Sequence, residues 1–369
     1  MLNRRIGGRV RHSFIPVLQL SIGLCASAAQ ADPPKFSVLK VNGVDAPAAI
    51  NNHGDIGGSR TVGGASSPED RAVIWLYGSH HLIEFGTLGG KQSSISGLND
   101  CDEAVGASSL KGDAVTHAAL FQNGKVRDLD VRDTGNSIAR GINNAGVAVG
   151  SITVKGVSHP ALFQNGKVHD LTGSRGDAYG ISLSGQITGE SVNQNDEDHA
   201  FIIDSGMLTD INPGYGAVSD AAAINDYGHV AGTEAAEFAF DVGPFLEDDS
   251  GFEGLPVLGP QVAMGFGLNN ADEVVGTTTY DDNPFIYHAF LYRNGVTYDL
   301  NTLIDPADPL AGSVNLTEAR GINDSGWIVA AGTDAKGVAH TYLLVRTSPD
   351  IELRRSKGGC GPDDHDDDR

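Results

Sequence analysis

The sequence predicts an all-β protein, a β-propeller of seven four-stranded blades. One turn motif, Asn or Ser preceded by Ile or Leu, recurs seven times along the chain. The repeating unit is about 45 residues long, which is the repeat length of a four-stranded propeller blade. Glycine supplies 49 of 369 residues and stands at fixed places in the units, as a chain with many tight turns requires.

The repeated motif predicts a turn between the first two strands of each unit, here called strands A and B. It begins at Asn51, Asn99, Asn143, Ser182, Asn225, Asn269 and Asn323. Three positions later stands Gly in five copies, with Asp102 and Asp272 in the other two. The first side chain can accept a backbone N–H and a terminal Gly suits a type I turn.

A very small residue stands seven positions after the start of each motif. These residues are Gly58, Gly106, Gly150, Gly189, Gly232, Gly276 and Ala330. Glycine inside a strand pattern indicates the close approach of another backbone. We therefore expect strand B to end at this residue.

A histidine-containing block predicts strand C. It occurs as His117–Phe121, His159–Phe163, His199–Ile202, His288–Leu291 and His340–Leu343, whereas the first and fifth units lack the His. The pairs Asn123-Gly124, Asn165-Gly166, Ser205-Gly206, Ser250-Gly251 and Asn294-Gly295 follow in the second to sixth units. Such pairs accept the positive φ of a two-residue hairpin turn, so we expect strand D directly after them.

The last unit has no sequence for strand D. The segment Phe36–Val41, which precedes the first strand A, alternates like a strand. If it pairs with the last unit, it closes the ring and leaves no free sheet edge. We therefore expect a propeller domain over residues 32–348, followed by an acidic and disordered tail over residues 349–369.

Residues 1–31 have the pattern of a cleaved secretory signal. Arg4, Arg5, Arg9 and Arg11 precede an apolar stretch over residues 14–29, and Ala29-Gln30-Ala31 forms an A-x-A cleavage site. An uncleaved membrane anchor is the alternative, but Pro16, Gln19 and Ser21 interrupt the stretch. We expect an exported protein, extracellular or periplasmic, with no transmembrane segment after cleavage. Export permits a disulfide between Cys101 and Cys360, which the sequence leaves open.

The charge excludes one class of partner. The chain has 25 basic and 47 acidic residues, a formal net charge of −22, and loss of the four signal arginines makes the mature charge −26. A nucleic-acid-binding protein needs a basic face, so we expect no nucleic-acid partner. The run Asp363–Asp368 in the tail is typical of a solvated segment, with weak cation binding as the alternative.

These motifs resemble the HAF repeats of bacterial extracellular proteins, which are named after a His-Ala-Phe triplet. The matching residues are Gly141-Ile142-Asn143, Val149-Gly150, His199-Ala200-Phe201 and Gly86-Thr87-Leu88-Gly89-Gly90. The resemblance covers about residues 45–346 and implies export and a propeller-like repeat. It implies no activity and no catalytic residues.

The recurrent histidines are interpreted as structural. With Asn123-Gly124 as a two-residue loop, Asp128 opposes Ala119, and His117 is its diagonal neighbour on the same face. The same register pairs His159 with Asp170, His199 with Asp210, and His288 with Asp299. We expect each pair to lock strand C to strand D within one blade. Histidines on separate blades cannot converge on one metal ion.

Acidic residues gather where the loops between strands B and C are expected. Asp196, Asp198, Asp281 and Asp282 are the candidate ligands for a metal ion, and calcium is the cation that such oxygen donors favour. No loop has the spacing of a calcium-binding loop, so solvation is the favoured interpretation. We expect no organic cofactor.

The function that the sequence favours is that of a non-catalytic exported binding scaffold. The polar residues that stand out recur once per unit, as structural residues do, and no nucleophile elbow or phosphate loop is present. We expect a monomer whose partner is an unidentified protein or glycan. The alternatives are a secreted glycan lyase or hydrolase and a surface or matrix component. An acid, a base and an arginine converging near the centre of the ring would favour the enzyme.

Overall fold

The computed structural model describes residues 33–64, 67–132, 135–193, 195–211, 217–236, 242–259, 262–280 and 283–347. The predicted signal over residues 1–31, the tail over residues 349–369, Cys360, Asp281 and Asp282 lie outside these ranges. The described residues from Pro34 onward belong to one compact unit. No helix among them is long and apolar enough to cross a lipid bilayer.

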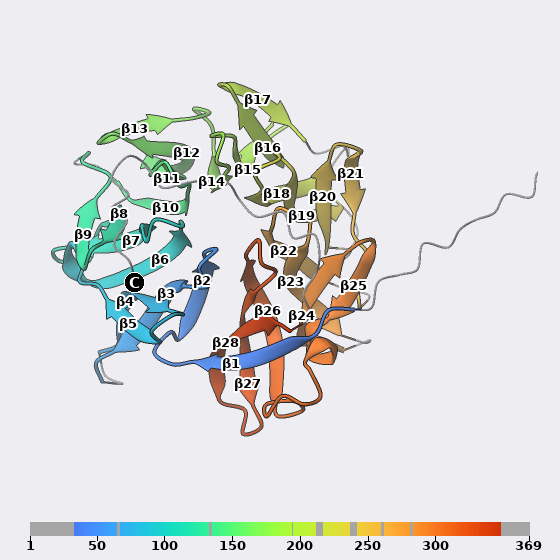
Figure 1. The fold of residues 1–369 in the computed structure, drawn as a ribbon. Helices are drawn as coiled ribbons and strands as arrows, with labels where there is room; N and C mark the ends of the chain where they lie inside the picture. The colour runs from blue at the N-terminus through green and yellow to red at the C-terminus, as the bar shows by residue number, and fades with distance from the viewer. Residues whose placement is uncertain are drawn as a thin grey trace, which may run out of the picture. The chain divides into compact units, whose positions relative to one another are not determined.

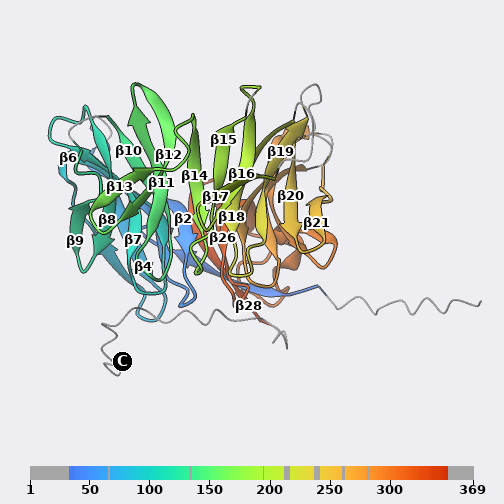
Figure 2. The same ribbon diagram turned by 90° about the horizontal axis from the view of Figure 1, so that it is seen from above.

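Seven four-stranded antiparallel sheets form a ring of blades, as the sequence predicts (Figure 1). Blades 1 to 3 are β2 (Ala46–Ile50), β3 (Ile56–Val62), β4 (Glu69–Leu76) and β5 (His81–Glu84); β6 (Gly89–Leu98), β7 (Ala104–Leu110), β8 (Thr116–Gln122) and β9 (Lys125–Asp128); and β10 (Ser137–Ile142), β11 (Ala148–Val154), β12 (Val157–Gln164) and β13 (Lys167–Asp170). Blades 4 to 6 are β14 (Gly176–Ile181), β15 (Ile187–Val192), β16 (Asp198–Asp204) and β17 (Met207–Asp210); β18 (Ala217–Ile224), β19 (Val230–Ala236), β20 (Val242–Asp248) and β21 (Gly251–Gly254); and β22 (Ala263–Leu268), β23 (Val274–Tyr280), β24 (Asn283–Arg293) and β25 (Val296–Asp299). Seen side-on, the blades stand next to one another with hairpin turns along both edges (Figure 2).

The seventh blade closes the ring with both ends of the domain. It contains β26 (Val314–Ile322), β27 (Ile328–Asp334) and β28 (Ala339–Arg346), and β1 (Phe36–Val41) pairs antiparallel with β28 as its fourth strand. This confirms the predicted closure by the N-terminal strand. The β25–β26 connection, which starts with the 3₁₀ helix η1 (Leu300–Leu303), supports β1 because Asp308 Oδ2 accepts a hydrogen bond of 2.9 Å from the Val38 N–H.

The small residues of strand B are where a backbone approaches closely, but they do not end the strand. Gly106 is the third residue of β7 (Ala104–Leu110), so the predicted end of strand B is wrong. A Cβ at Gly106 would overlap the carbonyl oxygen of Ser94 in β6. In every blade the register of strand A shifts near its end, at a β-bulge, and the extra residue pushes the backbone toward this glycine.

The seventh blade explains why alanine replaces glycine at position 330. A second register shift occurs in β26 between Leu316 and Glu318. It moves the close approach to Gly332, where a Cβ would overlap the carbonyl oxygen of Asn315. Ala330 is therefore free of the constraint that its six counterparts meet.

The hairpins between strands C and D mostly follow the prediction. Asn123 and Gly124 have φ of 53° and 69°, and the turns at Asn165, Ser205 and Asn294 likewise start with positive φ. The prediction is wrong in blade 5, where the pairing of Asp248 with Gly251 places the two-residue turn at Asp249-Ser250. Ser250 instead caps this turn, because its N–H and hydroxyl both bond to Asp248 Oδ1.

The core lies between the blades. Strand C of six blades carries one fully buried aromatic ring, at Phe121, Phe163, Phe201, Phe245, Phe290 and Tyr342. Phe121 packs with Ile74 of blade 1 and Ile95 of blade 2, so the same side chain joins two blades. Burial of each such side chain contributes about 1.5–3 kcal/mol. Packing of this kind fixes each blade against its neighbours and so positions the inner strands.

Candidate functional site

The structure brings the two members of each predicted His–Asp pair together. The His Nδ1 to Asp Oδ2 distances are 2.9 Å for His117–Asp128, 2.7 Å for His159–Asp170, 2.8 Å for His199–Asp210 and 2.7 Å for His288–Asp299. Each pair bridges strands C and D of one blade. Because the pairs belong to four separate blades, their histidines do not converge on a common point.

The remaining block histidine has a different partner. The last blade has β1 as its fourth strand, and β1 carries no Asp opposite His340. His340 Nε2 instead lies 3.1 Å from Asp334 Oδ2 in β27 and 3.0 Å from Lys40 Nζ in β1. The backbone N–H of Val338 and the His340 side chain lower the pKa of Asp334 to about 2.

The described acidic candidates for metal binding are paired with an arginine. Asp198 is the first residue of β16, and its Oδ1 lies 2.9 Å from Arg175 Nη2. Asp196 Oδ1 lies 3.9 Å from the same nitrogen. The Arg175 guanidinium therefore lies beside the two acids that were candidates for binding a cation, while Asp281 and Asp282 lie outside the described residues.

A ring of asparagines links the A–B turns of successive blades. Within each turn the Asn Oδ1 accepts two backbone N–H groups; Asn51, for example, bonds the N–H of His53 and of Asp55. Its Nδ2 donates to the main-chain oxygen of the corresponding residue in the next blade. The inter-blade bonds are Asn51 to Asn99, Asn99 to Asn143, Asn143 to Ser182, Asn225 to Asn269, Asn269 to Asn323 and Asn323 to Asn51, at 3.0–3.2 Å. Ser182 has no amide, so its side chain cannot continue the ring to Asn225.

The next residue of each turn forms a second ring, here called the mouth ring. Its members are Asn52, Asp100, Asn144, Leu183, Asp226, Asn270 and Asp324. Neighbouring members bond to one another: Asp100 Oδ1 accepts from the Asn52 N–H at 2.8 Å, and Asp324 Oδ2 accepts from Asn270 Nδ2 at 3.0 Å. The carboxylates of this ring thus accept hydrogen bonds from backbone N–H groups and side-chain amides, which carry no charge.

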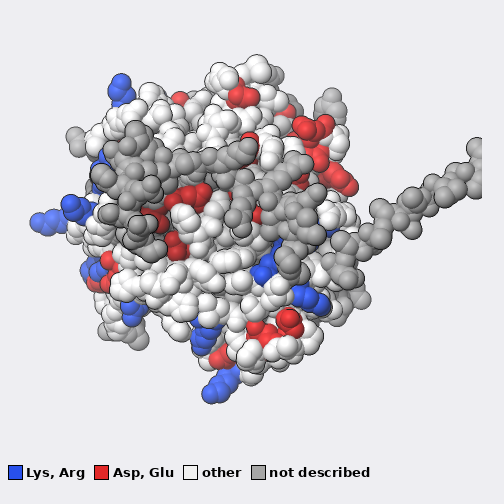
Figure 3. Space-filling view, viewed as in Figure 1, with Lys and Arg blue, Asp and Glu red and all other residues white. Residues whose placement is uncertain are grey.

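The two rings surround a cavity of about 160 Å³ at the centre of the blades. Its lining takes residues from all seven inner strands and turns, including the seven Ile or Leu residues that precede the six asparagines and Ser182. Three carboxylates, those of Asp100, Asp226 and Asp324, contribute to the lining, and none of the described lining residues is Lys, Arg or His. The site therefore has a formal charge of −3. The face of the molecule drawn in Figure 3 has acidic side chains near its middle and basic side chains mostly toward its edge.

A second polar group, here called the inner cluster, joins blades 3, 4 and 5. It consists of Arg140 in β10, Asp177 and Tyr179 in β14, Glu190 in β15 and Asp220 in β18. The Arg140 guanidinium lies 5.2 Å from the centre of the Tyr179 ring and 3.7 Å from Asp177 Oδ1. Arg140 Nε and the Oγ1 of the neighbouring, fully buried Thr188 have no hydrogen-bond partner.

The inner cluster holds acids with displaced pKa values. Burial raises the pKa of Asp220 to about 7, and the nearby Glu190 carboxylate acts in the same direction. Burial also raises the pKa of Glu190, against the effect of a hydrogen bond from Tyr179. Such displaced values beside an arginine and a tyrosine are common at functional sites. Sequence reasoning missed this cluster, because its members are unlike residues from different units.

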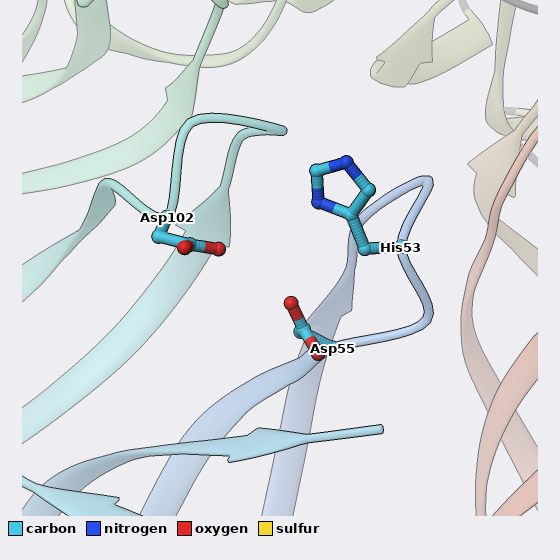
Figure 4. Close-up of side chains that lie close together, drawn as sticks. All are labelled: His53, Asp55 and Asp102. Atoms are coloured by element: carbon cyan, nitrogen blue, oxygen red, sulfur yellow. The ribbon is translucent and has the colours of Figure 1, made fainter. Parts of the chain in front are cut away.

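A third group lies where the A–B turns of blades 1 and 2 meet. His53, Asp55 and Asp102 place one ligand atom each within 4.8 Å of one another. Figure 4 shows His53 and Asp55 on the turn of blade 1, facing Asp102 on the turn of blade 2 (Figure 4). Sequence reasoning missed this group as well, although the unusual Asp at position 102 was a signal. Among the described residues it is the one group of three or more such side chains with this spacing.

The cysteine prediction falls partly outside the described residues. Cys101, in the A–B turn of blade 2, is disulfide-bonded. Cys25 and Cys360 both lie outside the described ranges. The pairing of Cys101 with Cys360 therefore stays a prediction.

Comparison with known proteins supports the fold alone. No family model matches the chain, and no curated protein matches it. The β-propeller domain of the Trilobed protease from Pyrococcus furiosus, described as having an open velcro topology, is similar at 9% identity and a TM-score of 0.55, covering 86% of this chain and 95% of that one. The putative TolB from Agrobacterium tumefaciens is similar at 13% identity and a TM-score of 0.43, covering 60% of this chain and 88% of that one.

Proposed function

We propose that this protein is an exported binding propeller that takes a positively charged group of its ligand into the central cavity. The observation that carries the proposal is the lining of that cavity, with three carboxylates and no basic residue among its described members. Net negative charge in a concave site attracts cationic groups. A lysine or arginine side chain of a protein partner is the group that fits this charge.

The ring architecture makes the cavity a preformed site. Its walls are held by hydrogen bonds between blades, such as that from Asn99 Nδ2 to the Asn143 oxygen at 3.0 Å. A preformed site loses little conformational entropy when its ligand binds. The blades therefore act as the scaffold, and the mouth ring provides the contact.

Calorimetric titration with a short oligolysine peptide tests this proposal. We expect binding that weakens as salt is raised, and a loss of at least tenfold in affinity when both Asp100→Asn and Asp226→Asn are introduced. Asp249→Asn with Asp204→Asn is the matched control, because it removes the same charge from exposed positions outside the cavity. If the control double variant weakens binding as much as the double variant of Asp100 and Asp226, only the overall charge of the protein matters and the proposed site is wrong.

A second candidate function, hydrolysis or lyase cleavage of a glycan, is favoured by the inner cluster. Arg140, Tyr179 and two acids with raised pKa values supply unlike groups near the centre of the ring. An acid with a pKa near 7 suits proton transfer at neutral pH. Incubation with a panel of polysaccharides tests this candidate: turnover that is lost in both Asp220→Asn and Tyr179→Phe would favour it over the binding scaffold.

Export and membership of the HAF-repeat group are part of the same proposal. The basic, apolar and A-x-A segments over residues 1–31 support export. The seven turn motifs and the five His blocks support the group. N-terminal sequencing of the protein recovered from periplasm or medium should begin at Asp32; a chain that keeps its first residues in the membrane fraction would contradict cleavage.

A further inference from the structure

The group formed by His53, Asp55 and Asp102 offers one nitrogen and two oxygen donors at a junction between two blades. Asp55 is 6% exposed, and its position is fixed because its Oδ1 accepts a hydrogen bond of 2.8 Å from the Tyr77 N–H. His53 and Asp102 are exposed. The group thus combines one buried, hydrogen-bonded carboxylate with one exposed imidazole and one exposed carboxylate.

The donor set matches a divalent transition metal better than calcium. Zinc binds His nitrogen and Asp oxygen at about 2.0–2.2 Å, with three protein ligands and a water in its open sites. Calcium takes six to eight oxygen donors, and two carboxylates with an imidazole do not supply them. The three donor atoms lie within 4.8 Å of one another, so they are close enough to share one ion.

A related junction in the same ring shows what a closed arrangement looks like. Asp272 occupies the position of Asp102 in blade 6, and like Asp102 it has a φ of 57° where five other turns have glycine. Its Oδ1 lies 2.7 Å from His229 Nδ1 and accepts from Asn225 Nδ2 at 2.9 Å. At the first junction the His53 imidazole has no hydrogen-bond partner among the described residues, so its nitrogens are available.

We propose that His53, Asp55 and Asp102 bind one divalent ion of the zinc class and thereby link blade 1 to blade 2. The ion is held by three protein ligands and keeps an open coordination position for water. This site is separate from the central cavity, and it does not depend on the function proposed for that cavity.

Zinc titration of the mature full-length chain, made without a polyhistidine tag and freed of metal with a chelator, tests the proposal. We expect zinc chloride to bind by calorimetry and to raise the unfolding temperature. His53→Ala and Asp102→Gly should each weaken this binding at least tenfold. Asp272→Gly is the matched control, because it makes the same change at the equivalent turn and should leave zinc binding unchanged.

The choice of Asp102→Gly keeps the test independent of folding. Glycine stands at this position in five of the seven turns, so this variant should unfold without zinc at the same temperature as the parent or higher. The proposal is wrong if zinc does not bind, if Asp102→Gly binds as tightly as the parent, or if Asp272→Gly loses as much affinity. Calcium chloride that binds in an Asp102-dependent manner would overturn the zinc assignment.

Discussion

The side chain of Asn323 donates a hydrogen bond of 3.0 Å to the main-chain oxygen of Asn51. These residues are 272 positions apart in sequence, and their bond joins the last blade to the first. The same bond type recurs at five other junctions of the ring. Ring closure therefore uses one repeated contact, together with the pairing of β1 and β28.

Asn323→Ala should destabilise the domain by about 1–3 kcal/mol, because it removes this bond and leaves the partly buried turn N–H groups of Ser325 and Trp327 without their acceptor. Ser182→Asn is the converse change. It supplies the missing amide opposite Asn225, and it should stabilise by about 0.5–1.5 kcal/mol. Urea denaturation followed by tryptophan fluorescence measures both; an equal loss in both variants would show that the side-chain amide is not what matters.

Gly106→Ala should destabilise the domain by about 3 kcal/mol or more, because the added methyl overlaps the Ser94 carbonyl and forces β6 from β7. Gly124→Ala is the control for loss of glycine. A Cβ added at position 124 would meet no atom within 4 Å, but the φ there is 69°. Gly124→Ala should therefore lower the free energy of unfolding only by the backbone strain, about 1–2 kcal/mol. Thermal unfolding of the two variants compares them, and a smaller effect at position 106 would contradict the close backbone approach.

His117→Ala should cost about 1–2 kcal/mol, because His117 is buried and its Nδ1 bonds to Asp128. His169→Ala, at an exposed position of the next blade, should be nearly neutral. A double-mutant cycle with Asp128→Ala isolates the pair, and its single effects should not add. Zinc affinity that falls in His117→Ala would contradict the structural interpretation.

Asp220→Asn should stabilise the domain at pH 7 but not at pH 3.5. The folded pKa of Asp220 is raised to about 7, so the native state keeps its proton while the unfolded state ionises above about pH 4. Stability is therefore lost as pH rises from about 4 to 7. The gain from Asn should approach about 4 kcal/mol at pH 7 as an upper limit. Denaturation series at both pH values check this, and a gain of equal size at both would show that burial of the charge is not its cause.

Glu273→Gln should destabilise the domain by about 3 kcal/mol, because it removes the negative charge between two basic side chains. Glu273 accepts from Arg346 Nη2 at 3.1 Å, and its Oε1 lies 3.2 Å from Arg293 Nε. The Glu273 and Arg346 side chains are each only 2% exposed. Glu318→Gln breaks a partly exposed pair with Arg320 and should cost less than about 1 kcal/mol. Chemical denaturation that ranks the two in the opposite order would contradict the role of burial.

The sequence predicted most of the fold because each repeat is built from turns and hairpins whose interactions are local in the chain. The turn at Asn51, the hairpin at Asn123-Gly124 and the strand pairing of Ala119 with Asp128 each depend on residues close in the chain. The sequence prediction misplaced the end of strand B. A glycine indicates the close approach of another backbone both at the end of a strand and opposite a β-bulge, so the two cases cannot be told apart. The prediction also misplaced the blade 5 turn, because Ser-Gly resembles the hairpin pairs of the other blades.

The sequence by itself determined the number of blades, the closing strand and the His–Asp neighbours, since each follows from a period or from hairpin register. Only the tertiary structure decided the central cavity, the inner cluster around Arg140 and the group at His53, Asp55 and Asp102. These sites join residues of different blades. The distances between these residues are set by how the inner strands pack around the ring. Because the residues differ in type and come from separate repeats, no regular spacing in the sequence predicts that they meet.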